Sequence, residues 1–268
     1  MNAIRQFKNG LDVGLFSFGI LWKHKKLILY LSVPKIVGML FELTKHNLFF
    51  VSPIRTTLFL RSMMSRFFYT FDGMQDVVIL LLEMTTILIT IFATVALTIH
   101  TFALLKKRKT GIKKSLKEAG KKIKPILLWT LISTAVYFLI DKLDILAYPY
   151  AGASCRHNLF FASTGILARL AWAIAFLFVI TLIAVEDKPL AKLVQKSFSL
   201  LRKLVWNYLG AMTWVVLIAA LGIGPLWFFS KQLAGYGIIY ITMAIIMFIT
   251  ATVPVIAKTV LYERHASK

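Results

Sequence analysis

Long apolar stretches alternate with short basic segments along this chain. The longest stretch, 77–105, contains 29 residues and is interrupted only by Glu83, His100 and a series of threonines. At a rise of about 1.5 Å per residue, a helix of this length exceeds the roughly 30 Å hydrocarbon layer of a bilayer. The next segment, 106–124, holds ten Lys/Arg residues and a single acid, Glu118. An apolar helix that runs into such a basic loop is typical of a membrane span whose loop stays in the cytoplasm.

The same alternation predicts the fold of the whole chain. We expect an all-α protein, a polytopic transmembrane helical bundle of about six spans that forms a single integral membrane domain over 1–268. Basic segments with apolar residues at helical spacing predict amphipathic helices that lie in the membrane plane on the cytoplasmic face. The predicted spans are about 27–43, 77–105, 125–140, 166–185, 205–229 and 237–257. The predicted interfacial helices are about 3–22, 112–123 and 189–204.

Two features modify this plan. Residues 44–76 combine aromatic and basic side chains, and no stretch among them is both long and charge-free enough to span. They therefore form either interfacial helices on the outer surface or a re-entrant segment. Proline residues predict bends in three spans, at Pro34, within 222–225 and at Pro254.

The distribution of charge decides which partners to expect. The chain is 59% hydrophobic and its mean hydropathy is +0.76, far from the soluble average. A net charge of +21 in a soluble protein would suggest nucleic acid. On the predicted topology, however, 23 of the 32 Lys/Arg residues fall on one side, as the positive-inside rule expects. The sequence therefore predicts a multi-pass protein of the cell (inner or plasma) membrane, with both termini cytoplasmic and no nucleic-acid partner.

The basic segments predict a different partner, the lipid bilayer with its anionic headgroups. Each Lys or Arg close to an anionic surface is attracted by about 1 kcal/mol. Protein partners and oligomeric state have no signal in the sequence. The candidate anionic-lipid contacts are Lys106, Lys107, Arg108, Lys109, Lys113, Lys114, Lys192 and Lys196.

Polar residues inside the predicted spans are few, and most lie on one helix. Glu83 and five threonines between 86 and 101 recur at steps of three and four, within about 60° of one direction on a helical wheel. This face either packs closely against another helix or lines a polar path. The charged residues of the spans sum to zero, which favours structural pairing, such as Glu83 with Arg169 or Lys35 with Glu42. The candidate intramembrane polar residues are Lys35, Glu42, Glu83, Thr86, Thr90, Thr94, Thr98, Thr101 and Arg169.

Enzyme chemistry has no support in the sequence. It contains no HExxH, G-x-S-x-G or Walker motif, and no GxGxxG between a strand and a helix. The single cysteine, Cys155, excludes an intrachain disulfide and a cysteine metal cluster, and the nearby His157 does not complete a metal site. We predict no catalytic, cofactor-binding or metal-binding residues, no cofactor and no enzymatic activity.

Two stretches of the chain resemble a known family. They are Phe7…Trp22…Lys26-Leu27…Pro34 and Glu186…Lys196-Ser197-Phe198-Ser199-Leu200-Leu201-Arg202-Lys203…Trp206. The chain looks like the uncharacterised six-span membrane proteins of bacteria and archaea that are known only as a domain of unknown function. That family is loosely similar to the membrane domains associated with glycerophosphodiesterases. The resemblance covers nearly the whole chain and implies the fold, but it supplies no catalytic residues. The chain departs from the family pattern at 179–185, which lacks a proline.

Two functions are compatible with these patterns. The first is a non-enzymatic integral membrane protein whose basic surface helices dock on the anionic inner leaflet. The alternative is a transporter or channel that uses the Glu83/threonine-lined face. The sequence favours the first, because spans with zero summed charge fit structural pairing better than an ion pathway.

Overall fold

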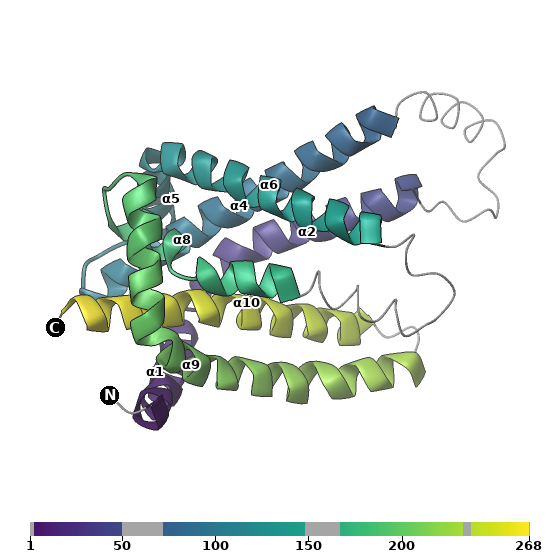
Figure 1. Ribbon diagram of the computed structural model, residues 1–268. Coiled ribbons are helices and arrows are strands. Elements are labelled where there is room, and N and C mark those ends of the chain that lie inside the picture. Colours follow the sequence, from purple (N-terminus) through teal and green to yellow (C-terminus); the bar gives the residue numbers. More distant parts are fainter. Residues whose placement is uncertain (1–2, 50–71, 148–166, 233–236, 268) are drawn as a thin grey trace. The chain divides into compact units, whose positions relative to one another are not determined.

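The described part of the computed structural model of the protein is almost entirely α-helical (Figure 1). It describes the backbone of residues 3–49, 72–147, 167–232 and 237–267. These residues contain no β-strand, so the predicted all-α class is confirmed. The elements are α1 (Ala3–Lys23), the 3-10 helix η1 (Lys25–Leu27), α2 (Ile28–Phe49), α4 (Asp72–Leu105), α5 (Ile112–Lys121), α6 (Ile123–Ala147), α8 (Val179–Val185), α9 (Leu190–Gln232) and α10 (Gly237–Ala266).

Five segments in the described part of the chain are long and apolar enough to cross a bilayer, as expected of an integral membrane protein. They are Leu80–Leu105, Ile123–Ile140, Leu167–Val185, Leu190–Gly222 and Ala244–Ala266. Large apolar side chains on these segments are exposed, including Leu139 (60%), Val216 (65%) and Leu221 (68%). Exposed apolar area of this extent is costly in water and fits contact with lipid.

Several predictions fall wholly or partly outside the described residues. The first predicted span, 27–43, lies in α2, which is helical, but the side chains from residue 40 onward are not described. Most of 44–76 is also outside, so the choice between an interfacial and a re-entrant segment stays open. Cys155 and His157 lie outside as well.

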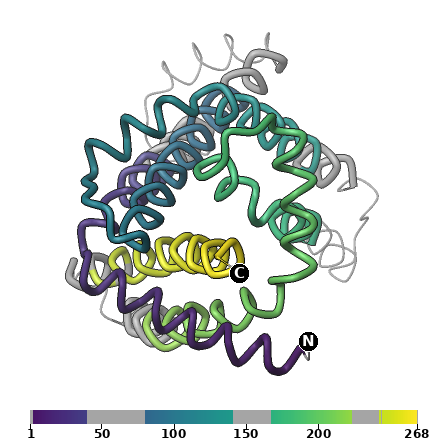
Figure 2. The backbone as a smooth tube through the Cα atoms, turned by 90° about the vertical axis from the view of Figure 1, so that its left-hand side faces the viewer, coloured from purple at the N-terminus to yellow at the C-terminus, as the bar shows by residue number. Residues whose placement is uncertain are grey.

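The residue contacts divide the chain into two compact units. The first unit comprises Met1–Ser32, Ile91–Ile126 and Leu170–Lys268, and the second comprises Val33–Thr90 and Leu127–Arg169. In the first unit, α10 packs beside both α1 and α9, as the yellow, purple and lime segments of Figure 2 show. Its core contains fully buried side chains from several elements, among them Leu97 of α4, Leu182 of α8 and Ile256 of α10.

A seam of glycines holds α1 against α9. A Cβ added to Gly10 would lie 2.1 Å from the backbone oxygen of Asn207, and a Cβ added to Gly210 would lie 2.2 Å from a backbone oxygen of α1. Backbones this close leave no room for a side chain. The predicted helix 3–22 is therefore present as α1, with one face buried in protein, while Trp22 on another face is 76% exposed.

Helix α9 joins two elements that the sequence predicts separately. The predicted interfacial helix 189–204 and the predicted span 205–229 form one continuous helix, which changes direction along its length (Figure 1). No glycine or proline occurs between 190 and 209, so nothing ends the backbone hydrogen-bond ladder at the predicted boundary. The boundary read from the sequence is a change of polarity within a single helix.

The predicted span 166–185 is interrupted near its middle. A turn at 176–178 separates a helical stretch from α8, and its backbone hydrogen bonds include i→i−3 bonds. The Phe178 N–H donates to Ser197 Oγ of α9 at 3.3 Å, and both residues are fully buried. A broken helix at membrane depth needs such partners for the backbone groups that leave the ladder.

Candidate anionic-headgroup interface

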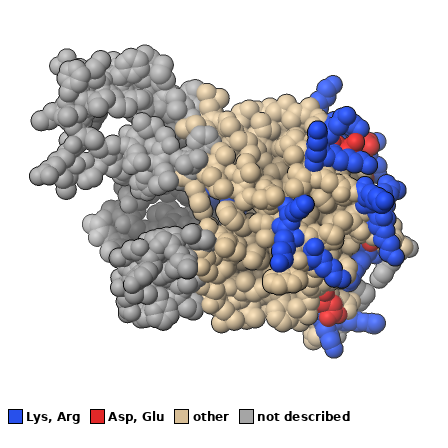
Figure 3. Space-filling model, turned by 180° about the vertical axis from the view of Figure 1, so that it is seen from behind, with Lys and Arg blue, Asp and Glu red and all other residues tan. Residues whose placement is uncertain are grey.

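The loop between α4 and α5 and the first turns of α5 and α9, all in the first unit, carry a set of exposed cations, here called the basic face. In Figure 3 most Lys and Arg side chains gather toward one edge of the view, with few acidic side chains among them. Seven of the eight predicted lipid contacts are exposed, and among the described residues none of the seven has a carboxylate within 4 Å, although Lys114 is close enough to Glu118 of the same helix to lower the pKa of that carboxyl. Their charged groups are therefore accessible to an anion outside the protein. The basic face comprises Lys106, Lys107, Arg108, Lys109, Lys113, Lys114 and Lys192.

The turn after α4 fixes the position of four of these cations. The N–H of Lys107 donates to the Leu104 carbonyl at 3.0 Å, and the N–H of Arg108 donates to the Ala103 carbonyl at 2.9 Å. These two bonds form a Schellman motif, whose left-handed residue is usually glycine. Here it is Lys107, with a φ of 55°. The left-handed conformation costs a residue with a Cβ about 1–2 kcal/mol. A lysine at this position therefore adds a positive charge to the turn but makes its backbone less favourable than a glycine would.

A carboxylate after α8 is shared by several elements. The Glu186 side chain is 11% exposed. Its Oε1 accepts hydrogen bonds from the Tyr262 hydroxyl at 2.7 Å and from Lys196 Nζ, while Lys188 Nζ lies 2.9 Å from Oε2. Burial acts to raise the pKa of Glu186, but the hydrogen bonds from these partners outweigh it and lower the pKa to about 2. Glu186 therefore stays ionised and links the end of α8 to α9 and α10.

Lys122 brings the α5–α6 junction into the same cluster. Its Nζ donates to the Glu186 carbonyl at 3.2 Å and to the Asp187 carboxylate. Lys196, predicted to contact lipid, instead gives its ammonium group to Glu186 and lies 5.8 Å from the Tyr262 ring centroid. Lys196 is thus set apart from the basic face, because a nearby acid neutralises it.

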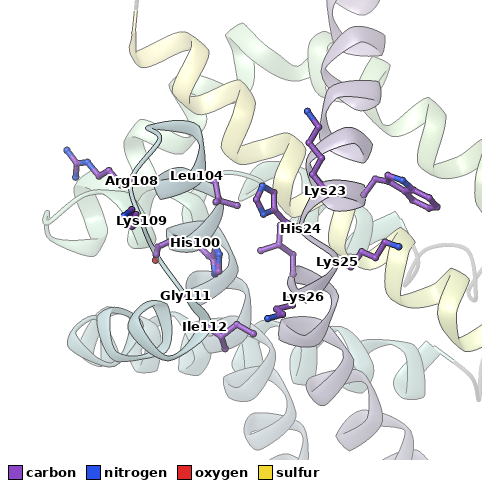
Figure 4. A pocket seen from close by; sticks show the side chains of 13 residues that line it. Lys23, His24, Lys25, Lys26, His100, Leu104, Arg108, Lys109, Gly111 and Ile112 are labelled. Atoms are coloured by element: carbon purple, nitrogen blue, oxygen red, sulfur yellow. The ribbon is translucent and has the colours of Figure 1, made fainter.

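A pocket of about 990 Å³ lies between the α1–η1 turn and the α4–α5 loop, within the first unit. In Figure 4, His24, Lys26 and His100 surround the space between these two segments, whereas Arg108 extends outward from the loop. No Asp or Glu lines the pocket. Its ionisable lining residues are Lys23, His24, Lys25, Lys26, His100, Arg108 and Lys109.

A polar contact between helices holds His100, one of the residues that line this pocket. The Tyr30 hydroxyl of α2 lies 2.8 Å from Nδ1 of His100 on α4, and both residues are buried. Ser115 Oγ of α5 donates to the Gly111 carbonyl at 3.1 Å. The contact of Nδ1 with Tyr30 holds the ring of His100, which lines the pocket.

The predicted threonine face of α4 behaves differently in its two halves. In the second unit, Thr86 and Thr90 donate to carbonyls four residues earlier at 3.0 and 2.8 Å, and a Cβ at Gly38 would lie 3.6 Å from Thr86. In the first unit, Thr98 and Thr101 are fully buried, and their hydroxyls have no hydrogen-bond partner among the described residues. Back-bonded and buried threonines favour close packing over a polar path.

The four charged residues predicted within spans are only partly described by the structure. Glu83 is half-buried in α4, Arg169 is exposed near the start of its span, and each interacts with another group. Lys35 is exposed on α2, and the side chain of Glu42 lies outside the described residues. The pairs Glu83–Arg169 and Lys35–Glu42 stay predictions.

Metal binding and known relatives supply no further assignment. The described residues contain no group of three or more His, Cys, Asp or Glu that could hold a metal ion. No family model matches the sequence, no curated protein is similar to it, and no solved structure matches the fold. The resemblance to the six-span family therefore stays a prediction, and the functional argument is built on the basic face and the pocket.

Proposed function

We propose that this protein is a non-enzymatic protein of the cell membrane whose basic face docks on the anionic headgroups of the inner leaflet. The observation that carries the proposal is the set of seven exposed cations, none of which forms an ion pair within 4 Å in the described part of the chain. These cations adjoin helices long enough to span a bilayer, so they belong at headgroup depth. At about 1 kcal/mol per basic residue, their combined attraction to anionic lipid is large.

The end of α1 supports the same placement. Trp22 is 76% exposed, and the Lys25 ammonium lies 4.9 Å from its ring centroid. Tryptophan is enriched at the level of the headgroups, because its ring is apolar and its N–H is polar. A neighbouring lysine suits a surface that carries negative charge.

Lipid titration of the purified protein tests the proposal. Phosphatidylglycerol added to protein in non-ionic detergent should raise the unfolding temperature more than phosphatidylcholine does, and salt should reduce the gain. Replacing Lys113 and Lys114 by Gln should diminish the gain, whereas replacing both by Arg, which keeps the charge, should not. Equal stabilisation by the two lipids at low salt would contradict the proposal.

A transporter or channel is the second candidate, and the interrupted helix at 176–178 is the observation that favours it. Broken helices at membrane depth form substrate sites in transporters. Glu83→Gln separates the two functions when stability and ion or solute flux in proteoliposomes are both measured. Loss of flux in a protein of unchanged stability supports transport. Lower stability, with no flux in the unaltered protein, supports close packing of the α4 face.

A further inference from the structure

We infer that the pocket between the α1–η1 turn and the α4–α5 loop is a binding site for a phosphate monoester. The inference rests on the proposed function and deepens it, because it names the chemical class of a specific ligand at the basic end of the first unit. The basic face attracts any anionic lipid, whereas this pocket selects one kind of headgroup or phosphorylated compound.

The charge of the lining is the first argument. Five Lys/Arg residues and two histidines line the pocket without any acid, and none of the five forms an ion pair among the described residues. Arg108 extends outward and the Lys25 ammonium lies over the Trp22 ring, so the inference rests on the three other lysines and the two histidines. A phosphate monoester carries about −1.5 to −2 charges at pH 7 and offers three strong acceptor oxygens. A phosphodiester headgroup carries one charge, so it satisfies fewer of these donors.

The geometry places donors on opposite walls. His24 and Lys26 come from the α1–η1 turn, Lys109 comes from the α4–α5 loop, and His100 lies between them with its ring held by Tyr30 (Figure 4). The α4–α5 loop is itself fixed by the Schellman turn at Lys107. A loop backbone and a histidine ring that are held in place before binding reduce the conformational entropy lost when a ligand arrives.

The size of the pocket indicates that the ligand is larger than a phosphate group alone. A volume of about 990 Å³ lies at the upper end of the range for small-molecule sites, so the phosphate is one part of a larger ligand. Leu104 and Ile112 also line the pocket and give the rest of the ligand an apolar contact. A lipid with a phosphate headgroup and a soluble phosphorylated metabolite share this chemistry.

Binding measurements with three probes test the inference. We would titrate the full-length protein in non-ionic detergent with short-chain phosphatidic acid, short-chain phosphatidylglycerol and glycerol 3-phosphate. Phosphatidic acid should bind about tenfold more tightly than phosphatidylglycerol, because it forms more charge-assisted hydrogen bonds. Displacement by glycerol 3-phosphate would identify a soluble phosphorylated ligand. Binding of phosphatidic acid without such displacement would identify a lipid headgroup, and either result supports the site.

A pair of matched double variants locates the site. Lys26→Gln with Lys109→Gln removes two charges from the pocket, and Lys117→Gln with Lys203→Gln removes two exposed charges that belong neither to the pocket nor to the basic face. The pocket pair should weaken phosphatidic acid binding about tenfold more than the control pair. Unfolding temperatures without lipid check that both variants fold, and the comparison of lipids on the unaltered protein needs no variant.

The contrary outcomes separate the two proposals. Equal affinity for the two anionic lipids would overturn the monoester site and leave docking of the basic face intact. A preference for phosphatidic acid that the pocket pair does not reduce would place the site elsewhere and also overturn the inference. If neither anionic lipid binds better than phosphatidylcholine, the proposed function itself fails.

Discussion

At the scale of single residues, Glu186 shows how an acid can stabilise an end of the protein that is otherwise basic. Its carboxylate accepts hydrogen bonds from Tyr262 and Lys196, and its backbone carbonyl accepts one from Lys122. Removing the acid takes the counter-charge from Lys196 and the charged acceptor from Tyr262, whereas Lys122 keeps the backbone carbonyl and the Asp187 carboxylate. Because a lost hydrogen bond to a charged group costs about 1.5–3 kcal/mol, Glu186→Gln should lower the free energy of unfolding by about 2 kcal/mol at pH 7.

The pH dependence gives this substitution its signature. The pKa of Glu186 is about 2 in the folded protein against 4.5 for the free side chain. Its stabilising contribution is therefore fully present above pH 4.5 and is lost as the pH falls toward 2. Unfolding in detergent between pH 6 and 3 should show a smaller loss of stability for Glu186→Gln than for the unaltered protein. Glu118→Gln is the control, since Glu118 is exposed and the cations that act on it, Lys114, Lys117 and Lys121, all lie on its own helix. Equal pH slopes for both variants would contradict the assigned role.

At the scale of elements, the contact of α1 with α9 depends on glycine at particular positions. Gly10→Ala should place a methyl group against the backbone of α9 and destabilise the protein by about 1–3 kcal/mol. Gly19→Ala in the same helix is the matched control, because nothing lies within 4 Å of its added Cβ. It should stabilise the helix by about 0.5–1 kcal/mol. Unfolding temperatures in detergent measure both changes, and equal tolerance of the two substitutions would show that α1 does not pack on α9 through this seam.

Elements were predictable where a local pattern sets them. The amphipathic periodicity of 3–22 and 112–123 predicts α1 and α5 closely, because helical spacing is a property of neighbouring residues. Packing of α1 on α9 was not predicted, although Gly10-x-x-x-Gly14 is a small-residue pattern that signals close helix contact. The interruption before α8 has no local cause in its apolar sequence, since it depends on Ser197 accepting a backbone hydrogen bond from another element.

At the scale of the whole molecule, hydropathy and charge predict the membrane class and the basic face, and contacts distant in sequence create the rest. Exposure of residues such as Lys106 and Lys113 follows from their own polarity. Tyr262 meets Glu186 across 76 residues, and Tyr30 meets His100 across 70. Contacts between residues so far apart cannot be predicted from the local pattern of a single sequence. The pocket was missed for the same reason, because His24 and His100 come from different helices.

The orientation of the protein is the prediction on which the functional proposals depend. In a Cys155→Ala background, single cysteines at the exposed positions Lys117→Cys and Gln195→Cys should react with a membrane-impermeant thiol reagent only from the cytoplasmic side. The reason is that ten Lys/Arg residues in 106–124 hold this loop on the cytoplasmic side. Val216→Cys should react from neither side, because its exposed position lies in an apolar span that lipid covers. If the impermeant reagent labelled position 117 or 195 in intact cells, the basic face would lie on the outer side of the membrane and not at the inner leaflet. Docking on that leaflet would then be refuted, whereas the Glu186 cluster and the glycine seam would be unaffected, since they depend only on contacts within the first unit.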